Sequence, residues 1–261
     1  MFNLLIPVLS SGGSSGFSFS NAEAETYVAA MSVEPDDDRK LLIDTYVGAL
    51  KSAAIWTKLD ILYLLAAHDS QAARINLKNP SVFTLADVST GPSFVVDQGF
   101  TGNGSTTALN TQFTPSANGV NFVRDDCSIF FYVRVAGNTN RDVGGGNAPS
   151  TRVASNSAGV TTFRINDATD TAISNGGNTT GMFGVSRSGT TKGAFRNGAS
   201  LGTATVASTG INAQSQYICA ANNSTFSDKQ ISMAAWGSAL TGLESSFYTA
   251  TLSYLQGVGA A

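Results

Sequence analysis

The feature that most constrains the fold is a change of hydrophobic period near residue 78 of this 261-residue chain. After that point apolar and polar residues alternate over short runs, of which CSIFFYVRVAG, from Cys127 to Gly137, is the strongest. Alternation of this kind places every second side chain on one face of a strand. The turn sequences NSAG and NGGN separate further short runs, and Asn197-Gly198 is a two-residue hairpin signal. Several short strands joined by turns predict a sandwich or a barrel.

Before residue 78 the pattern predicts helices. Ser20 and Glu23 have the spacing of a capping box, and three consecutive aspartates stand where carboxylates favour the start of a second helix. A third short helix is expected in KLDILYLLAAHDSQAARI, which gives two or three helices over residues 21–75. The end of the chain, residues 238–260, keeps near-helical spacing and predicts a closing helix.

The N-terminus is interpreted as an apolar docking peptide on a flexible tether, residues 1–20, because a Ser/Gly-rich stretch follows the apolar run. It lacks the basic region of a secretion signal and is too short to span a membrane. A disordered start explains it equally well. The expected organisation is therefore this peptide, a helical attachment or oligomerisation segment over residues 21–78, and a sandwich domain over residues 79–261.

Composition excludes several classes of function. The net charge is −3 and no basic run occurs, which argues against nucleic-acid binding through phosphate neutralisation. Cys127 and Cys219 are interpreted as two small buried residues, and no Cys/His cluster encodes a zinc site. Three aspartates are candidate calcium ligands, but their spacing lacks the oxygen density of a calcium loop. No metal and no cofactor are predicted. The aspartates are Asp142, Asp167 and Asp170.

Three stretches together resemble the concanavalin A-like, or laminin G-like, jelly-roll superfamily. They are RSGTTKGAFRNGASLG, with Phe195 one residue before the turn, the closing YICAANNSTFSDKQISMAAWGSALTGLESSFY, and the opening DQGFTGNGSTTALNTQFTPS. The resemblance covers roughly residues 21–255. It implies a mainly β fold: a jelly-roll sandwich preceded by a short N-terminal helical segment and closed by a C-terminal helix.

The expected helical segment before the sandwich and the opening stretch DQGFTGNGSTTALNTQFTPS resemble parts of phage virion proteins. The resemblance therefore also implies a tail-fibre, tail-tip or head-spike component of a bacteriophage or phage-like particle. Such a protein is assembled in the host cytoplasm and located on the virion. Its N-terminal segment is expected to contact other virion proteins, and its sandwich to contact host surface polysaccharide or neighbouring subunits. A homo-oligomer is expected, with a trimer favoured, and neither nucleic-acid binding nor membrane insertion. A bacterial lectin or adhesin is a further alternative.

Catalysis is not predicted, and the protein is expected not to be an enzyme. Glycan hydrolases of the resembled fold carry two glutamates on one strand, but all four glutamates here lie in the expected helices. The single histidine, His68, lies outside the sandwich, which argues against a histidine-based triad. The enzymatic alternative is a capsular polysaccharide depolymerase that uses aspartates. The candidates are Asp125, Asp126, Asp167 and Asp170.

A sugar site is the remaining functional hypothesis. The loops AGNTNRDVGGGNAPS and NDATDTAISNGGNTT supply groups that bond hydroxyls, and a tyrosine ring is a candidate platform for a pyranose. The same loop residues are typical of turns, and the tyrosine can equally pack against a neighbour. The candidate residues are Tyr132, Asn138, Asn140, Asp142, Asn175 and Asn178.

Overall fold

The strand periodicity after residue 78 produces two facing antiparallel sheets in the computed structural model, which describes residues 16–138 and 141–261. The larger sheet consists of β1 (Leu59–Leu64), β3 (Ser93–Val95), β4 (Gly99–Thr101), β6 (Asp126–Val135), β11 (Gly181–Ser188), β12 (Thr191–Arg196), β13 (Ala199–Thr205) and β17 (Gln230–Gly237). Their order is β13-β12-β11-β6-β17-β4-β3, and β1 pairs with β17 on the same side as β4.

The smaller sheet has seven strands in the order β10-β9-β8-β7-β14-β5-β2. They are β2 (Ala86–Val88), β5 (Ala108–Asn110), β7 (Val143–Gly145), β8 (Ser150–Ser157), β9 (Val160–Asp167), β10 (Thr171–Ser174) and β14 (Tyr217–Ile218). A separate short hairpin is formed by β15 (Ala220–Ala221) and β16 (Thr225–Phe226). The predicted sandwich is thus confirmed, while the finer prediction of a jelly roll stays a prediction.

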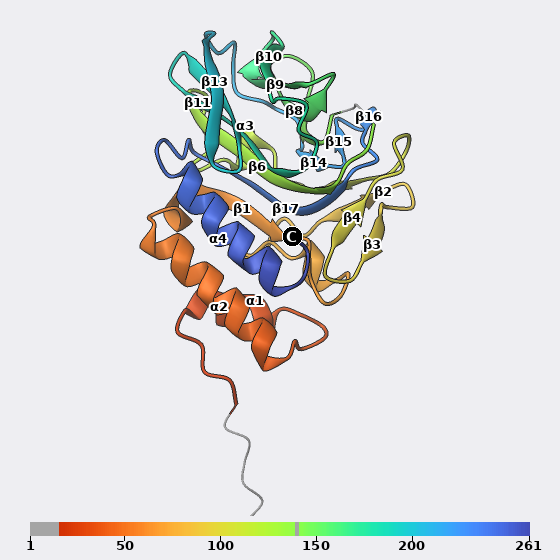
Figure 1. The fold of residues 1–261 in the computed structure, drawn as a ribbon, viewed down its shortest axis with the longest axis vertical. Helices are drawn as coiled ribbons and strands as arrows, with labels where there is room; N and C mark the ends of the chain where they lie inside the picture. The colour runs from red at the N-terminus through yellow and green to blue at the C-terminus, as the bar shows by residue number, and fades with distance from the viewer. Residues whose placement is uncertain (1–15, 139–140) are drawn as a thin grey trace, which may run out of the picture.

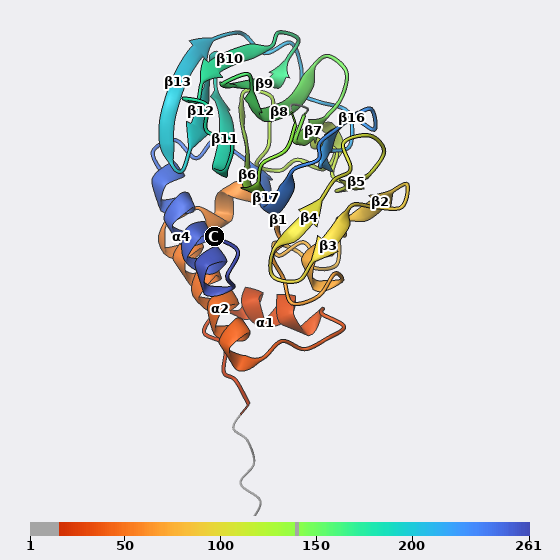
Figure 2. The ribbon, with the colours of Figure 1, turned by 45° about the vertical axis from the view of Figure 1, so that its right-hand side comes forward.

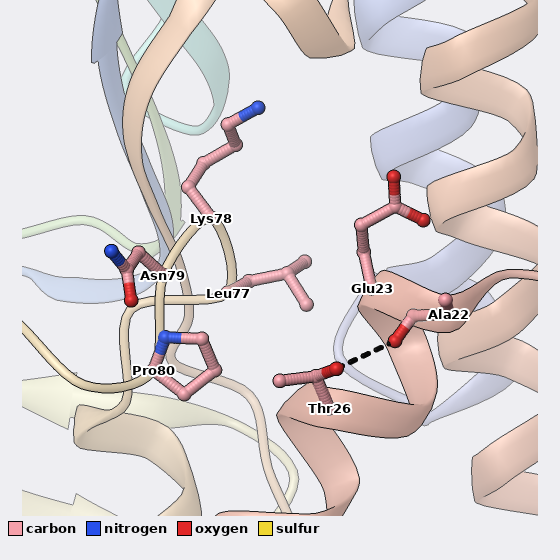
Figure 3. A pocket seen from close by; sticks show the side chains of 7 residues that line it. All are labelled: Ala22, Glu23, Thr26, Leu77, Lys78, Asn79 and Pro80. Carbon is pink, nitrogen blue, oxygen red and sulfur yellow. Dashed lines mark hydrogen bonds between the residues drawn. The ribbon is translucent and has the colours of Figure 1, made fainter.

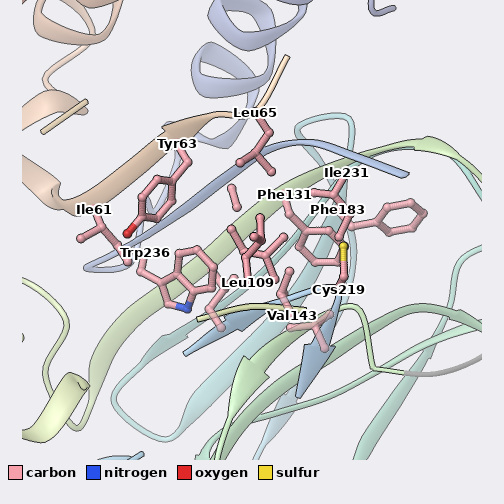
Figure 4. Packing of buried hydrophobic residues seen from close by; sticks show 14 of the residues in the cluster. Ile61, Tyr63, Leu65, Leu109, Phe131, Val143, Phe183, Cys219, Ile231 and Trp236 are labelled. Atoms are coloured by element: carbon pink, nitrogen blue, oxygen red, sulfur yellow. The ribbon is translucent and has the colours of Figure 1, made fainter. Parts of the chain in front are cut away.

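The main core fills the space between the two sheets. Phe131 of β6, Phe183 of β11, Phe163 of β9 and Trp236 of β17 are all fully buried there. Figure 4 shows this packing, with Trp236 and Phe183 beside residues of the smaller sheet such as Leu109. Both cysteines are buried and free, as the sequence predicts.

Three helices cover the outer face of the larger sheet: α1 (Ala22–Ala29), α2 (Asp37–Ser52) and α4 (Glu244–Gly257). Figures 1 and 2 show them on one side of β1, β6 and β17, with β8, β9 and β10 on the other side. Asp36 caps α2 by accepting a hydrogen bond from the backbone N–H of Arg39 at 2.8 Å. Shorter helical turns are α3 (Pro115–Asn118) and the 3₁₀ turns Trp56–Lys58 and Ala72–Arg74.

The prediction of a helix in KLDILYLLAAHDSQAARI is wrong, because Leu59–Leu64 of this segment forms strand β1. This strand packs against the main core on one face and against the helix layer on the other. A strand buried on both faces loses the polar alternation by which a strand is recognised, so its sequence resembles that of a buried helix.

The capping box expected at Ser20 and Glu23 is wrong, because the N-cap of α1 is Asn21, which makes no side-chain cap bond. The N–H of Ser20 donates to Asp44 at 3.0 Å instead.

The predicted turn and closing helix are confirmed. Asn197 and Gly198 both have positive φ, 49° and 77°, as a type I′ turn requires. The closing helix is α4. Within the described residues, no helix has the length and apolarity needed to cross a membrane. Most of the expected docking peptide, residues 1–15, lies outside the described part of the chain.

Candidate functional site

The sugar-site residues predicted from the sequence lie on different sides of the molecule. Tyr132 of β6 is half-buried against the helix layer, and burial raises the pKa of its phenol. Asp142 is fully buried beside the smaller sheet, where it forms an ion pair with Lys229 at 3.0 Å. Tyr132 and Asp142 are therefore separated by the larger sheet and the main core.

The predicted asparagines are engaged in local hydrogen bonds. Asn138 donates to Asp228 through its backbone and side-chain nitrogens, at 2.6 and 2.9 Å. Asn175 is 2% exposed and donates to the carbonyl of Ser155, whose N–H also donates to Asp142. Asn178 donates to the carbonyl of Asn175, and Asn140 lies outside the described residues. The structure brings Asp142 and Asn175 together, and sugar binding by these residues stays a prediction.

The aspartates of the depolymerase alternative also have internal partners. Asp125 accepts a hydrogen bond from Ser208, and Asp126 accepts one from the backbone N–H of Ala239 at 2.7 Å. Asp167 is buried between Arg187 and Lys192, each at 2.7 Å. Across the described part of the chain, no three His, Cys, Asp or Glu side chains gather closely enough to hold a metal ion.

Asp170 has a different environment, because three arginines surround it. Burial by itself would raise the pKa of its carboxyl, but Arg141, Arg164 and Arg152 hold that pKa below its usual value. A general acid in glycoside hydrolysis needs a raised pKa instead. Asp170 is therefore unsuited to that role.

One surface hollow, of about 340 Å³, lies between α1 and the loop at residues 77–80 (Figure 3). Its polar side chains are occupied within the protein. Glu23 pairs with Lys51, Thr26 donates to the carbonyl of Ala22, and Lys78 donates to the carbonyl of Trp56. A binding site requires polar groups that converge on a ligand, so this hollow is not the best candidate.

A second cavity, of about 290 Å³, lies beside β14 at the smaller sheet. Tyr217, the first residue of β14, lines it with its ring directed away from the main core, because the next residue, Ile218, points into that core. Three other segments complete the wall: the β7–β8 loop, the loop before β14, and the tip of the β15–β16 hairpin. The lining residues are Gly146, Asn147, Gln214, Tyr217, Asn222, Asn223 and Ser224.

The polar side chains of this cavity are available to a ligand. Those of Asn147, Gln214, Tyr217 and Asn223 form no hydrogen bond with another residue that the structure describes, whereas most predicted sugar-site residues do. Oδ1 of Asn222 is buried and has no hydrogen-bond partner within the described residues.

The chemistry of the lining narrows the class of ligand. None of the seven lining residues is charged, and their amide and hydroxyl groups both donate and accept hydrogen bonds. A sugar hydroxyl also donates and accepts, and the face of a tyrosine ring supplies an apolar surface beside these groups. The cavity therefore suits a neutral polyhydroxylated ligand better than an ion.

The sequence analysis missed this cavity. The sequence Asn222-Asn223-Ser224 is typical of a turn between strands, and the pattern around Tyr217 indicates only an outward-facing strand residue. Gln214 and Asn147 lie 67 residues apart in sequence and meet only because β7 and β14 are neighbours in the smaller sheet. No local signal reports a contact of that kind.

Comparison with known proteins identifies relatives by fold only. No family model and no curated protein sequence matches the chain. A mutant of Trypanosoma rangeli sialidase that displays trans-sialidase activity matches 82% of this chain and 39% of its own, with a TM-score of 0.54 and 10% identity. The same sialidase in complex with 2-keto-3-deoxy-D-glycero-D-galacto-2,3-difluoro-nononic acid matches 80% of this chain and 39% of its own, with a TM-score of 0.50 and 8% identity. The chain thus spans about two fifths of the length of these sialidases.

This likeness corrects the prediction that the protein is not an enzyme, because solved chains that share its fold include sialidases, which are enzymes. The prediction was drawn from the absence of a glutamate pair, and not every glycosidase uses one: sialidases act through a tyrosine nucleophile. At 10% identity the likeness shows the fold alone, and it assigns no reaction to this chain.

Proposed function

We propose that the sandwich binds carbohydrate at the cavity beside β14, with the ring of Tyr217 as the platform for a sugar ring. One observation carries this proposal: an uncharged cavity of about 290 Å³ joins a tyrosine face to several amide side chains that have no partner among the described residues. The fold shared with sialidases supports a glycan-related role, since those proteins are glycan-processing.

The test is binding of a panel of neutral oligosaccharides to the full chain, measured by calorimetry or by NMR shift changes. Tyr217→Ala is expected to weaken binding at least about tenfold, equivalent to about 1.4 kcal/mol. Tyr132→Ala is the matched control, because Tyr132 lies against the helix layer on the other sheet. Loss of binding in Tyr132→Ala and its retention in Tyr217→Ala would move the site to the residues predicted from the sequence.

The same mixtures are analysed for shortened products, because the fold is shared with enzymes. Products that form with the wild-type chain and not with Tyr217→Ala would add a reaction to the binding site. If the oligosaccharides remain intact, binding without a reaction stays the proposed function of the cavity.

A finer hypothesis is that the chain is a virion component, attached through its N-terminal segment and helical residues, with the sandwich directed toward host polysaccharide. No comparison supports this role, which comes from the sequence resemblance alone. Its test is the amount of this chain in purified particles: a fixed stoichiometry supports it, and absence from the particles contradicts it. Sedimentation of the purified chain tests the expected trimer.

A further inference from the structure

The hollow between α1 and the loop at residues 77–80 holds one side chain whose chemistry the proposed carbohydrate binding does not use. Lys78 lines that hollow, which has a volume of about 340 Å³ (Figure 3). Its side chain is only partly exposed, and its Nζ lies 3.8 Å from the centroid of the Trp56 ring. The amine of Lys78 is therefore partly withdrawn from water at the wall of an open hollow.

Lys78 has no carboxylate partner among the residues that the structure describes. Its side chain donates a hydrogen bond to the carbonyl oxygen of Trp56 instead. A partly buried amine without a carboxylate partner loses hydration and gains no ion pair in return, which favours its neutral form. Several other lysines of the chain do have carboxylate partners: Lys40, Lys51, Lys192 and Lys229.

Burial dominates the protonation of this amine. It lowers the pKa of Lys78 from 10.5 to about 8, while Glu23 on α1 and Asp60 on β1 act in the opposite direction. The face of the Trp56 ring also favours the cation, and Glu23 is itself paired with Lys51 of α2 at 2.9 Å. At about pH 7 roughly one chain in ten thus carries a neutral amine here, against fewer than about one in a thousand for an ordinary lysine.

The surroundings of Lys78 allow this amine to act as a nucleophile. Its hydrogen bond to Trp56 uses an N–H and leaves the lone pair of a neutral amine unused. Leu77 and Pro80 supply apolar wall, and the carboxylate of Glu23 disfavours an anionic ligand. Figure 3 shows Lys78 and Glu23 on opposite sides of the hollow. The hollow therefore suits a small neutral molecule with an apolar body.

We infer that Lys78 is a covalent site for small neutral aldehydes, which it binds as an imine in this hollow. The lone pair of Nζ forms a bond to the carbonyl carbon, the carbonyl oxygen takes up a proton, and the nitrogen loses one. The carbinolamine then loses its hydroxyl group with a proton as water, and a carbon–nitrogen double bond remains. One amine and one aldehyde thus give one imine and one water, without an oxidant or a reductant.

The test traps the imine in the full chain with propanal and cyanoborohydride. The reductant delivers a hydride to the imine carbon and leaves a stable propyl-lysine. Peptide mapping by mass spectrometry then measures the trapping rate at each lysine separately. At about pH 7 the rate at Lys78 is expected to be at least about tenfold higher than at Lys51.

Lys51 is the matched internal control. It lies beside the same Glu23, but its side chain is 41% exposed and its Nζ is held in an ion pair with that carboxylate. Access to the reagent favours Lys51, so a faster reaction at Lys78 reports the state of the amine and not its exposure. Equal rates, or a faster reaction at Lys51, overturn the inference.

The pH dependence provides a second readout. The ratio of the rates at Lys78 and Lys51 cancels the pH dependence of the reductant, because both residues react in one sample. This ratio is expected to be greatest below about pH 8 and to fall as the pH is raised toward about 10, where the amine of Lys78 is already neutral. A ratio that stays constant over this range means that the two amines titrate alike, which contradicts the inference.

Thr26→Phe tests whether the hollow holds the aldehyde. Thr26 is exposed on the α1 side of the hollow and donates only to the carbonyl of Ala22 within its own helix, so Lys78 and Trp56 keep their contacts. The new ring occupies part of the hollow and is expected to slow trapping at Lys78 several-fold, with trapping at Lys51 unchanged. Circular dichroism confirms that the variant is folded. An unchanged rate at Lys78 would remove the hollow from the site.

This inference is independent of the proposed carbohydrate binding. Tyr217 lies on the smaller sheet, whereas Lys78 contacts the helix layer through Trp56. Tyr217→Ala is therefore expected to leave the trapping rate at Lys78 unchanged, and each proposal can fail without the other.

Discussion

The two sheets of this protein share one core, but they differ in what covers their outer faces. The larger sheet has the main core on one side and α1, α2 and α4 on the other, so all eight residues of β17 are buried. The smaller sheet has the same core on one side, while its outer row holds Tyr217, Arg152 and Arg164, all partly exposed. The first sheet is a scaffold fixed by packing, and the second is free to carry a binding site.

The most direct test of this difference between the sheets is to remove a large side chain from the helix-covered face of the larger sheet. Phe130 is fully buried, with its ring 5.5 Å from that of Phe247 in α4 and 6.2 Å from that of Phe195. Phe130→Ala is expected to lower the free energy of unfolding by about 3–5 kcal/mol, because it leaves a cavity between sheet and helices. Denaturant unfolding measures this change.

The counterpart on the open face is Tyr217→Ala, which is expected to change the free energy of unfolding by less than about 1 kcal/mol. If Phe130→Ala proved as mild as Tyr217→Ala, the helices would not be an integral layer of the fold. The proposed attachment role of the helical segment would then gain weight, because that segment would be free to serve another contact.

A smaller effect is expected from adding one methyl group to the same covered face. A Cβ at Gly184 would lie 2.0 Å from the ring of Phe130, so Gly184→Ala forces that ring to move. Overpacking of this kind is expected to lower the free energy of unfolding by about 1–3 kcal/mol. In the control, Gly193→Ala on the next strand, the new Cβ meets no atom closer than 3.4 Å. Equal losses in the two variants would indicate a general effect of alanine rather than contact with Phe130.

The pH dependence of folding stability tests the packing of Lys78 at the edge of the helix layer. Lys78 lies over the ring of Trp56, with Nζ 3.8 Å from the ring centroid, and burial lowers its pKa from 10.5 to about 8. Between about pH 8 and pH 10.5 the unfolded chain therefore binds more protons at this site than the folded chain does. Stability rises with pH wherever that holds.

The wild-type chain is thus expected to gain stability relative to Lys78→Met as the pH rises from about 7 to about 10. Denaturant unfolding of both proteins at several pH values measures the difference. Stability curves that run parallel over this range would mean that Lys78 keeps an ordinary pKa in the folded state, and that the edge of the helix layer is more hydrated than its contacts suggest.

Much of the fold could be predicted from the sequence because its signals are local. The alternation in CSIFFYVRVAG predicts β6, Asn197-Gly198 predicts the turn before β13, and the periodic end of the chain predicts α4. Strand β1 could not be predicted in this way, because burial on both faces removes the alternation. Its assignment depends on the helices above it and the core below it.

The candidate site depends almost entirely on the tertiary structure. The sequence by itself determined a mainly β chain with helical ends, few charges and outward-facing polar turns, because backbone periodicity and turn chemistry act over a few residues. Strand order and register decided that Tyr217, Arg152 and Arg164 share one row, and that Tyr132 faces the helices instead. Sheet pairing joins residues that are far apart in the chain, so only the folded structure shows which side chains meet.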